Sequence, residues 1–504
     1  MRSLRHSAMM ATALLGLLAA AACGGDDDST EGGGGEAGGG EIAVAGQFPT
    51  ESIDPNGPLA IDGGTRVASI QLYSPLLQTI GPGEFDPAAA ESWEINDTAT
   101  EFTFTLREGI TFSDGSPITG QDVAASFERT VASDSPFSAN FVNVSVAATD
   151  TTVTFTTAEP DPALPAKLTG LMITPASATE DSYLGTPVTS GPFKVESFTP
   201  GGDLVMVPNE NYWGEQPSVD QLTIRSIPEV AARVTALETG ELDVIWGISD
   251  DQVAQLGGNT EVEVVSAVGS GVLTMWMNAS TPALEKAEVR RALWQAVDFD
   301  KKIDALYPES GEPADSVIAP TVFGYAPQEP VVYDPEAARQ ALIDAGFDFD
   351  TTLRFHFSQT QFRQWVDSVV SDLAAIGVKV EALEKEQAVY TEDLLALNWD
   401  INIQQVGTLG LDASYNLGRL YTCAAERTGY CNPELDEMLR RAGTSVDPAE
   451  REAAYAEATE LIWTEAVGMY PMFVKNLFAT RTSVSGFEPD GEGLPRFDTV
   501  SVDE

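Results

Sequence analysis

Histidine is almost absent from this chain. Among its 504 residues, only His6 and His356 are histidines. Serine triads, Cys–His pairs and histidine-based metal sites therefore lack the residues that they need. The sequence has no Gly-Lys-Ser/Thr phosphate loop, and its glycine-rich run is of low complexity, so it is not a dinucleotide fingerprint. We therefore predict no catalytic residue, no metal site and no cofactor.

Basic residues are also scarce. The chain has 27 Lys and Arg residues against 77 Asp and Glu residues, which gives a formal net charge of −50. A surface this acidic repels nucleic acid and anionic lipid headgroups, so neither is expected as a partner. Two interpretations stay open: a solvated surface suited to a salty or alkaline medium, or electrostatic steering of a cationic ligand. The 43% apolar content is enough for two or three domains of about 150 residues each.

No apolar run is long enough to span a membrane. The run Ala8–Ala22 has about fifteen residues and follows a basic start, so we predict a signal peptide at residues 1–22. It ends in small residues directly before Cys23 and resembles the lipobox of bacterial lipoproteins, although Ala20 stands where that motif prefers Leu. The resemblance implies that Cys23 is the lipid attachment site. A simple secretory leader with a coincidental cysteine is the alternative.

The segment after this cysteine predicts a tether. Residues 23–40 are rich in Gly, Asp and Glu and have no apolar side chain that could join a core, so we expect a flexible linker. A lipid anchor and a linker would hold a folded domain on the outer face of the cytoplasmic membrane. Membrane contact is then expected through the anchor only.

Two further cysteines lie close together in the sequence. Cys423 and Cys431 stand in a chain predicted to be exported, where oxidation is allowed. We predict a disulfide between them, with two free buried thiols as the alternative. Two cysteines without histidine or further thiolates make a poor zinc site.

Strands and helices alternate along the rest of the chain. Residues 102–106 alternate apolar and polar side chains, as a half-buried strand does. Asp334 and Pro335 predict the start of a helix that Gly346 ends. Apolar residues from 362 to 376 repeat at helical spacing. This alternation predicts the α/β fold class.

An ordered set of motifs resembles a known family, the solute-binding proteins of the oligopeptide, dipeptide and nickel type that serve ATP-binding cassette importers. One such match would carry little weight, but these run in the family's order along most of the chain. The matching segments are residues 73–77, 90–94, 102–122, 191–201, 209–214, 236–244, 277–292 and 432–436.

The resemblance implies a two-lobed periplasmic-binding-protein-like clamshell. Its first lobe would comprise residues 41–268 and 478–504, with an extra subdomain at about 67–185, and its second lobe residues 269–477. The hinge crossings would lie near 268 and 478. Gly269, Ser270 and Gly271 at the first crossing are small residues that absorb backbone rotation. The ligand would lie between the lobes.

The resemblance also implies the function. We expect a monomeric extracytoplasmic receptor that captures a small solute, a peptide or peptide-like molecule, and delivers it to the permease subunits of an importer. A sensor on the same fold, or a non-peptide ligand such as a sugar, opine or metal chelate, is the alternative. An exported hydrolase that uses two carboxylates is a weaker alternative, because acidic residues are plentiful in this chain but the motifs argue against it.

The family's amine-binding motif is altered in this chain. Peptide-binding members have a Gly-Trp-x-x-Asp segment whose Asp meets the α-ammonium of the peptide. Val406 stands at the Trp position and Leu409 at the Asp position. An ammonium buried beside Leu409 would cost several kcal/mol unless another acid pairs with it. We therefore predict that the ligand is not a free-amine peptide held in the usual way, unless Asp412 takes this role after a shift of three residues.

Further cleft candidates come from segments that reach the cleft in the family. Aromatic side chains there could stack on a flat or apolar ligand. Core packing is the alternative for the tryptophans, and structural hydrogen bonding is the alternative for the amides. The candidates are Trp246, Trp276, Tyr73, Gln404, Gln405 and Asn416.

Overall fold

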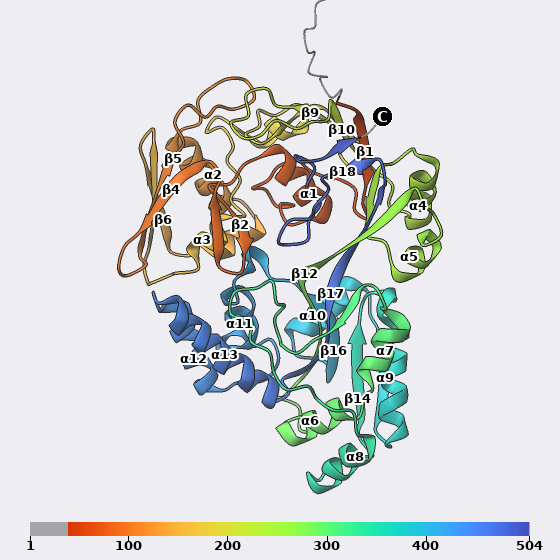
Figure 1. Ribbon diagram of the computed structural model, residues 1–504. Coiled ribbons are helices and arrows are strands. Elements are labelled where there is room, and N and C mark those ends of the chain that lie inside the picture. Colours follow the sequence, from red (N-terminus) through yellow and green to blue (C-terminus); the bar gives the residue numbers. More distant parts are fainter. Residues whose placement is uncertain (1–38, 503–504) are drawn as a thin grey trace, which may run out of the picture. The chain divides into compact units, whose positions relative to one another are not determined.

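The computed structural model describes residues 39–502. From Gly39 onward the chain forms one compact unit, in which helices and strands alternate (Figure 1). The predicted α/β class is therefore confirmed. The predicted signal peptide, Cys23 and most of the predicted tether lie outside the described residues. Within residues 39–502, every helix is too short or too polar to cross a bilayer.

One sheet of eleven strands runs through this unit. Two of its strands, β12 and β17, are 16 and 14 residues long and pair in antiparallel fashion near its centre. The order is β15 (Lys379–Glu384), β14 (Thr352–Phe357), β16 (Ile401–Val406), β12 (Val262–Met277), β17 (Gly468–Arg481), β11 (Val244–Trp246), β1 (Glu41–Ala45), β10 (Gln221–Arg225), β9 (Leu204–Pro208) and β8 (Phe193–Phe198), with β13 (Gly311–Pro313) beside β17.

A second sheet carries the strand predicted at residues 102–106. In β5 the side chains of Phe102, Phe104 and Leu106 are buried and the residues between them are more exposed, which confirms the alternation. The sheet order is β4 (Ala90–Ile95), β5 (Glu101–Leu106), β7 (Thr152–Thr157) and β6 (Val144–Ala148). Two short pairs complete the strands: β2 (Leu77–Gly81) with β3 (Glu84–Pro87), and β18 (Val484–Ser485) with β19 (Ser501–Val502).

One helix begins at the polar cap that the sequence predicts. The Asp334 carboxylate accepts a hydrogen bond from the backbone N–H of Ala337 at 2.9 Å, which starts α8. The α-helices are α1 (Gly63–Leu72), α2 (Gly120–Ala132), α3 (Leu164–Leu168), α4 (Val230–Thr239), α5 (Asp250–Leu256), α6 (Ala287–Gln295), α7 (Phe299–Leu306), α8 (Pro335–Asp344), α9 (Arg363–Ala375), α10 (Gln387–Leu395), α11 (Ser414–Tyr421), α12 (Pro433–Thr444) and α13 (Pro448–Thr464). The 3-10 helices are η1 (Pro136–Phe141), η2 (Glu180–Leu184), η3 (Thr360–Phe362), η4 (Leu409–Leu411) and η5 (Cys423–Ala425).

Separate hydrophobic cores lie in the two predicted lobes. One core comprises buried residues between Val272 and Phe473, which is the second lobe. The first lobe has cores built from residues up to Leu256 and from Leu477 onward. A further core between Leu76 and Ile173, together with Ala60, is that of the extra subdomain. Helix α1 packs in a core of the predicted first lobe.

Strands β12 and β17 pass from the cores of one lobe to the core of the other. Their register is continuous from Val262 to Val268 and resumes at Val272. The predicted hinge residues 269–271 occupy this interruption. It faces residues 473–475 of β17, slightly before the predicted crossing at 478. The lobe limits themselves stay a prediction.

Candidate ligand-binding site

A cavity of about 280 Å³ lies in the first lobe. We call it the first-lobe pocket. Its wall is built from α1 with the loop that follows, β2, Pro87 and Ala88, the segment after α3, Pro192, the loop after β9, and the C-terminal segment before β19. The polar and aromatic side chains in its wall are Arg66, Tyr73, Ser74, Gln78, Thr79, Thr169, Tyr212, Trp213, Glu215, Asp490, Glu492, Arg496 and Asp498.

Carboxylates outnumber guanidiniums in this wall. Arg66 forms an ion pair with Glu492, and Arg496 forms one with Asp498, with 2.9 Å between the guanidinium Nη2 and the carboxylate Oδ2. Asp490 is a further acid, and no ion pair holds it within residues 39–502. Its Oδ1 accepts hydrogen bonds from the backbone N–H groups of Glu492 at 2.9 Å and Leu494 at 2.8 Å.

The carboxyl group of Asp490 is held in an environment that disfavours its charge. Loss of hydration and the neighbouring negative charge of Glu492 raise its pKa to about 6 from an ordinary value of 3.8. The backbone hydrogen bond from Leu494 and the charge of Arg66 act in the opposite direction but are smaller. A cation that entered this pocket would therefore find an acid whose ionised form it stabilises.

Glu492 connects the first lobe to the second. While its Oε2 is paired with Arg66, its Oε1 accepts a hydrogen bond from the backbone N–H of Gly410 at 3.2 Å. Gly410 directly follows Leu409. An acid from the C-terminal segment therefore reaches the residue next to Leu409, which stands at the position where the resemblance implies an amine-binding Asp.

The segment around Gly410 makes a close contact with the subdomain. Gly410 has a φ of 69°, and a Cβ atom at this position would lie 2.4 Å from the carbonyl oxygen of Ala166. Only glycine fits this combination of positive φ and close backbone approach. Leu409 packs against the subdomain core and lines neither of the two cavities described. Its side chain is therefore placed in an apolar contact between the lobes.

Asp412 has a structural partner. Its Oδ2 lies 2.8 Å from Nη2 of Arg451, and both side chains are buried. Its Oδ1 accepts a hydrogen bond from the backbone N–H of Ser414 at 2.9 Å. This placement favours a structural role for Asp412 over the predicted ammonium-binding role, because the carboxylate already neutralises a buried guanidinium and lines neither cavity. The sequence did not indicate Arg451 as its partner.

A second cavity, of about 130 Å³, lies in the second lobe. We call it the second-lobe pocket. It brings together three of the predicted candidates, Trp276, Gln404 and Gln405, with two arginines that the sequence did not single out. Trp276 is almost fully buried, and its indole N–H donates to the hydroxyl of Tyr421 at 3.1 Å. The complete wall is Trp276, Gln404, Gln405, Val406, Gly407, Arg419, Leu420 and Arg427.

The disulfide shapes one side of the second-lobe pocket. Cys423 and Cys431 are bonded to each other, so the loop between them is closed. Arg427 lies in this loop and faces the pocket. Among the described residues, no group of three or more His, Cys, Asp or Glu side chains is arranged to hold a metal ion.

Two aromatic candidates, Tyr73 and Trp246, differ in their placement. Tyr73 lines the first-lobe pocket, is buried, and donates its hydroxyl to the carbonyl oxygen of Ile53 at 3.1 Å. Trp246 lines neither cavity and packs on Phe497 with ring centroids 6.3 Å apart, so core packing describes it.

Asn416 is placed as a positioning residue. Its amide nitrogen donates to the carbonyl oxygen of Gly407 at 3.0 Å and to the hydroxyl of Thr408 at 2.8 Å. Its amide oxygen accepts a hydrogen bond from Arg419 at 3.1 Å. Asn416 thus fixes both the start of the 407–411 segment and one arginine of the second-lobe pocket, without lining the pocket itself.

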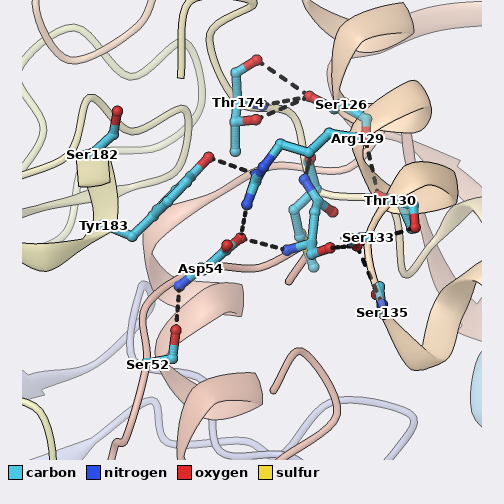
Figure 2. A network of polar contacts seen from close by, with 12 residues as sticks. Ser52, Asp54, Ser126, Arg129, Thr130, Ser133, Ser135, Thr174, Ser182 and Tyr183 are labelled. Atoms are coloured by element: carbon cyan, nitrogen blue, oxygen red, sulfur yellow. Dashed lines mark hydrogen bonds and ion pairs between the residues drawn. The ribbon is translucent and has the colours of Figure 1, made fainter. Parts of the chain in front are cut away.

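A buried polar network supports the wall behind Tyr73. Figure 2 shows the ion pair between Asp54 and Arg129, with the hydroxyl of Tyr183 accepting a hydrogen bond from the same guanidinium at 2.9 Å. The ring of Tyr183 meets that of Tyr73 edge to face at 6.5 Å. Because Arg129 belongs to α2, the network joins the subdomain to the pocket wall of the first lobe.

The fold and the two cavities define an extracellular solute-binding protein. The sequence profile of the bacterial extracellular solute-binding proteins, family 5, matches residues 84–427. This chain belongs to that family, and its predicted role as a solute-binding protein is confirmed.

Individual relatives match over most of the chain. The dipeptide-binding protein of Escherichia coli is 23% identical over 497 residues, covering 88% of this chain and 92% of its own. Heme-binding protein A of Haemophilus influenzae is 26% identical over 498 residues, covering 88% of this chain and 89% of its own. The structure of the substrate-binding protein CtaP of Listeria monocytogenes superposes with a TM-score of 0.83 at 22% identity, covering 92% of this chain and 100% of its own. The predicted two-lobed fold is therefore confirmed.

Proposed function

We propose that this protein captures a peptide or peptide-like solute whose ammonium group is bound in the first-lobe pocket by Asp490. The observation that carries the proposal is this carboxylate, which lines the cavity and has no ion pair within the described residues. An ammonium beside it would form a charge-assisted hydrogen bond in a site with reduced hydration. The acid would replace, from the first lobe, the one that is missing at Leu409.

The interlobe contacts support capture by closure. Glu492 bonds to Arg66 of the first lobe and to the backbone of Gly410 in the second. A ligand bound beside Asp490 would lie next to this bridge and would favour the closed arrangement. A ligand shifts the equilibrium between open and closed lobes when it makes more contacts in the closed arrangement than in the open one. Delivery of the closed complex to the permease follows as the transport step.

The binding test compares free amines with blocked amines. We expect a dipeptide and tripeptide library to raise the thermal unfolding midpoint of the protein, and N-acetylated copies of the same peptides to bind at least about tenfold more weakly. Asp490→Asn should remove this difference. Glu488→Gln, an exposed acid two residues away, is the matched control and should retain it.

The same experiment separates the competing functions. Binding of sugars, opines or metal chelates in place of peptides would contradict the proposed ligand class. Chromatography of the peptide after incubation should return it unchanged, because the protein is proposed to have no enzymatic activity. Consumption of the peptide would favour the hydrolase.

We also propose that the mature chain is a monomer anchored by a lipid on Cys23. Cys23→Ala should release the protein from the membrane fraction into the medium, while leaving peptide binding intact. Mass spectrometry of the N-terminal fragment should find a diacylglyceryl cysteine. An unmodified fragment that begins elsewhere would contradict the anchor and favour a simple secretory leader.

A further inference from the structure

We propose that the second-lobe pocket binds a carboxylate group of the ligand between Arg419 and Arg427. This inference rests on the proposed function and names a second chemical feature of the same ligand. The two arginines line one cavity, and neither forms an ion pair with a carboxylate anywhere in residues 39–502. In a chain where acidic residues exceed basic ones by 77 to 27, two such guanidiniums facing one cavity call for an anion from outside.

The two guanidiniums are held where they repel each other. Arg419 is fixed by Asn416, which accepts its hydrogen bond at 3.1 Å, and by the ring of Tyr415 at 4.6 Å. Arg427 is carried by the disulfide-closed loop. Burial and the nearby charge of Arg419 lower the pKa of Arg427. An anion placed between them would remove the repulsion and accept hydrogen bonds from both.

The remaining wall suits a planar anion. The side-chain amides of Gln404 and Gln405 can donate hydrogen bonds, and Trp276 provides an apolar surface beside them. Arginine is the cation whose planar fork matches a carboxylate. A cavity of about 130 Å³ has room for one such group and a short stem, and not for a large part of a ligand.

The pocket lies close to the hinge and to the interlobe bridge. A Cβ atom on Gly271 would lie 2.8 Å from the amide nitrogen of Gln405, so this wall abuts the interruption in β12. Gly407 lines the pocket, and three residues later Gly410 bonds to Glu492, which lines the first-lobe pocket. The segment 407–410 thus connects an acid-rich pocket to an arginine-lined one, which suits the two ends of a zwitterion.

The test compares ligand carboxylates with their amides. The probes are dipeptides and tripeptides as free acids and as matched C-terminal amides, measured by calorimetric titration. We expect the wild-type protein to bind the acids at least about tenfold more tightly than the amides. Arg427→Gln should reduce this ratio to near one.

Two further variants guard the result. Arg419 lies on an exposed part of α11. If the Arg427→Gln variant does not fold, the same comparison of acids with amides is made on Arg419→Gln. Arg339→Gln, an exposed arginine on α8 in the same lobe, is the matched control for the loss of one positive charge and should retain the ratio.

The outcomes distinguish this inference from the proposed function. Equal binding of acids and amides, unchanged in both variants, overturns the carboxylate subsite while peptide binding stands. If no peptide binds, titration with acetate and inorganic phosphate decides: saturable acetate binding that Arg427→Gln abolishes supports the subsite and contradicts only the peptide. Tighter binding of phosphate than of acetate, or no binding of either, overturns it.

Discussion

At the scale of single residues, the ion pair of Asp412 with Arg451 indicates a structural role for this buried acid. The sequence places this acid near the family's amine-binding position, but its carboxylate pairs with Arg451 in the core of the second lobe. A buried carboxylate with such a partner holds the structure together, because neither charge can regain water without unfolding.

Asp412→Asn is therefore expected to lower the free energy of unfolding by about 3 kcal/mol, since it leaves the guanidinium of Arg451 buried without a counter-charge. Urea denaturation measures the loss. Asp350→Asn is the control: its ion pair with Lys379 is exposed and should contribute nothing measurable. A stable Asp412→Asn variant that no longer binds peptides would restore the ammonium-binding role.

The raised pKa of Asp490 predicts a pH dependence of binding and of stability. Its folded pKa of about 6 exceeds the ordinary 3.8, so the folded state binds more protons than the unfolded state between these values. Stability contributed by this group is therefore lost as pH rises from about 4 to about 6, and Asp490→Asn should gain relative to wild type over that window. Free-amine binding should strengthen through the same window. A flat difference between the two proteins would contradict the assignment.

At the scale of elements, the contact between η4 and α3 depends on one glycine. Gly410→Ala would place a Cβ atom against the carbonyl of Ala166 in a backbone conformation that alanine disfavours. We expect a loss of about 1–3 kcal/mol in stability and a looser contact between the lobes. Thermal unfolding and small-angle scattering measure these. Gly418→Ala, where the added Cβ meets open space, should be neutral or stabilising; equal behaviour of both variants would contradict the account.

Secondary structure could be predicted from the sequence because helices and strands depend on patterns of residues that are close together in the chain. The alternation of β5 and the apolar repeat of α9 each lie within one short segment, and the Asp334 cap lies within one turn. The ordered motifs similarly indicated the solute-binding protein family, because each motif is a short local segment. Trp276, Gln404 and Gln405, three of the predicted cleft candidates, line one cavity because β12 and β16 are paired strands.

The acids and arginines of the two pockets could not be predicted in this way. Arg66 and Glu492 are 426 residues apart, and no local pattern marks such a contact. Arg427 lines its pocket from the loop that the disulfide closes, and no local pattern marks that placement. In a chain with so many acids, composition gave no reason to single out Asp490 or to pair Asp412 with Arg451.

At the scale of the whole molecule, the net charge of −50 should make stability depend on salt. Acidic groups on the surface repel one another, and added salt screens this repulsion. We expect the thermal unfolding midpoint to rise as sodium chloride increases from about 0.01 M to about 1 M, where the Debye length falls from about 30 Å to about 3 Å. An unchanged midpoint would show that the acidic surface imposes no cost, and would favour its role in steering a cationic ligand.

The central claim is that the protein holds an unmodified solute by groups from both lobes. Native mass spectrometry of protein purified under mild conditions tests this most directly. The account predicts a noncovalent adduct whose released component carries both an amine and a carboxylate. That adduct should be lost in Asp490→Asn and Arg427→Gln and retained in Glu488→Gln and Arg339→Gln. An adduct without either group, retained in all four variants, would contradict it.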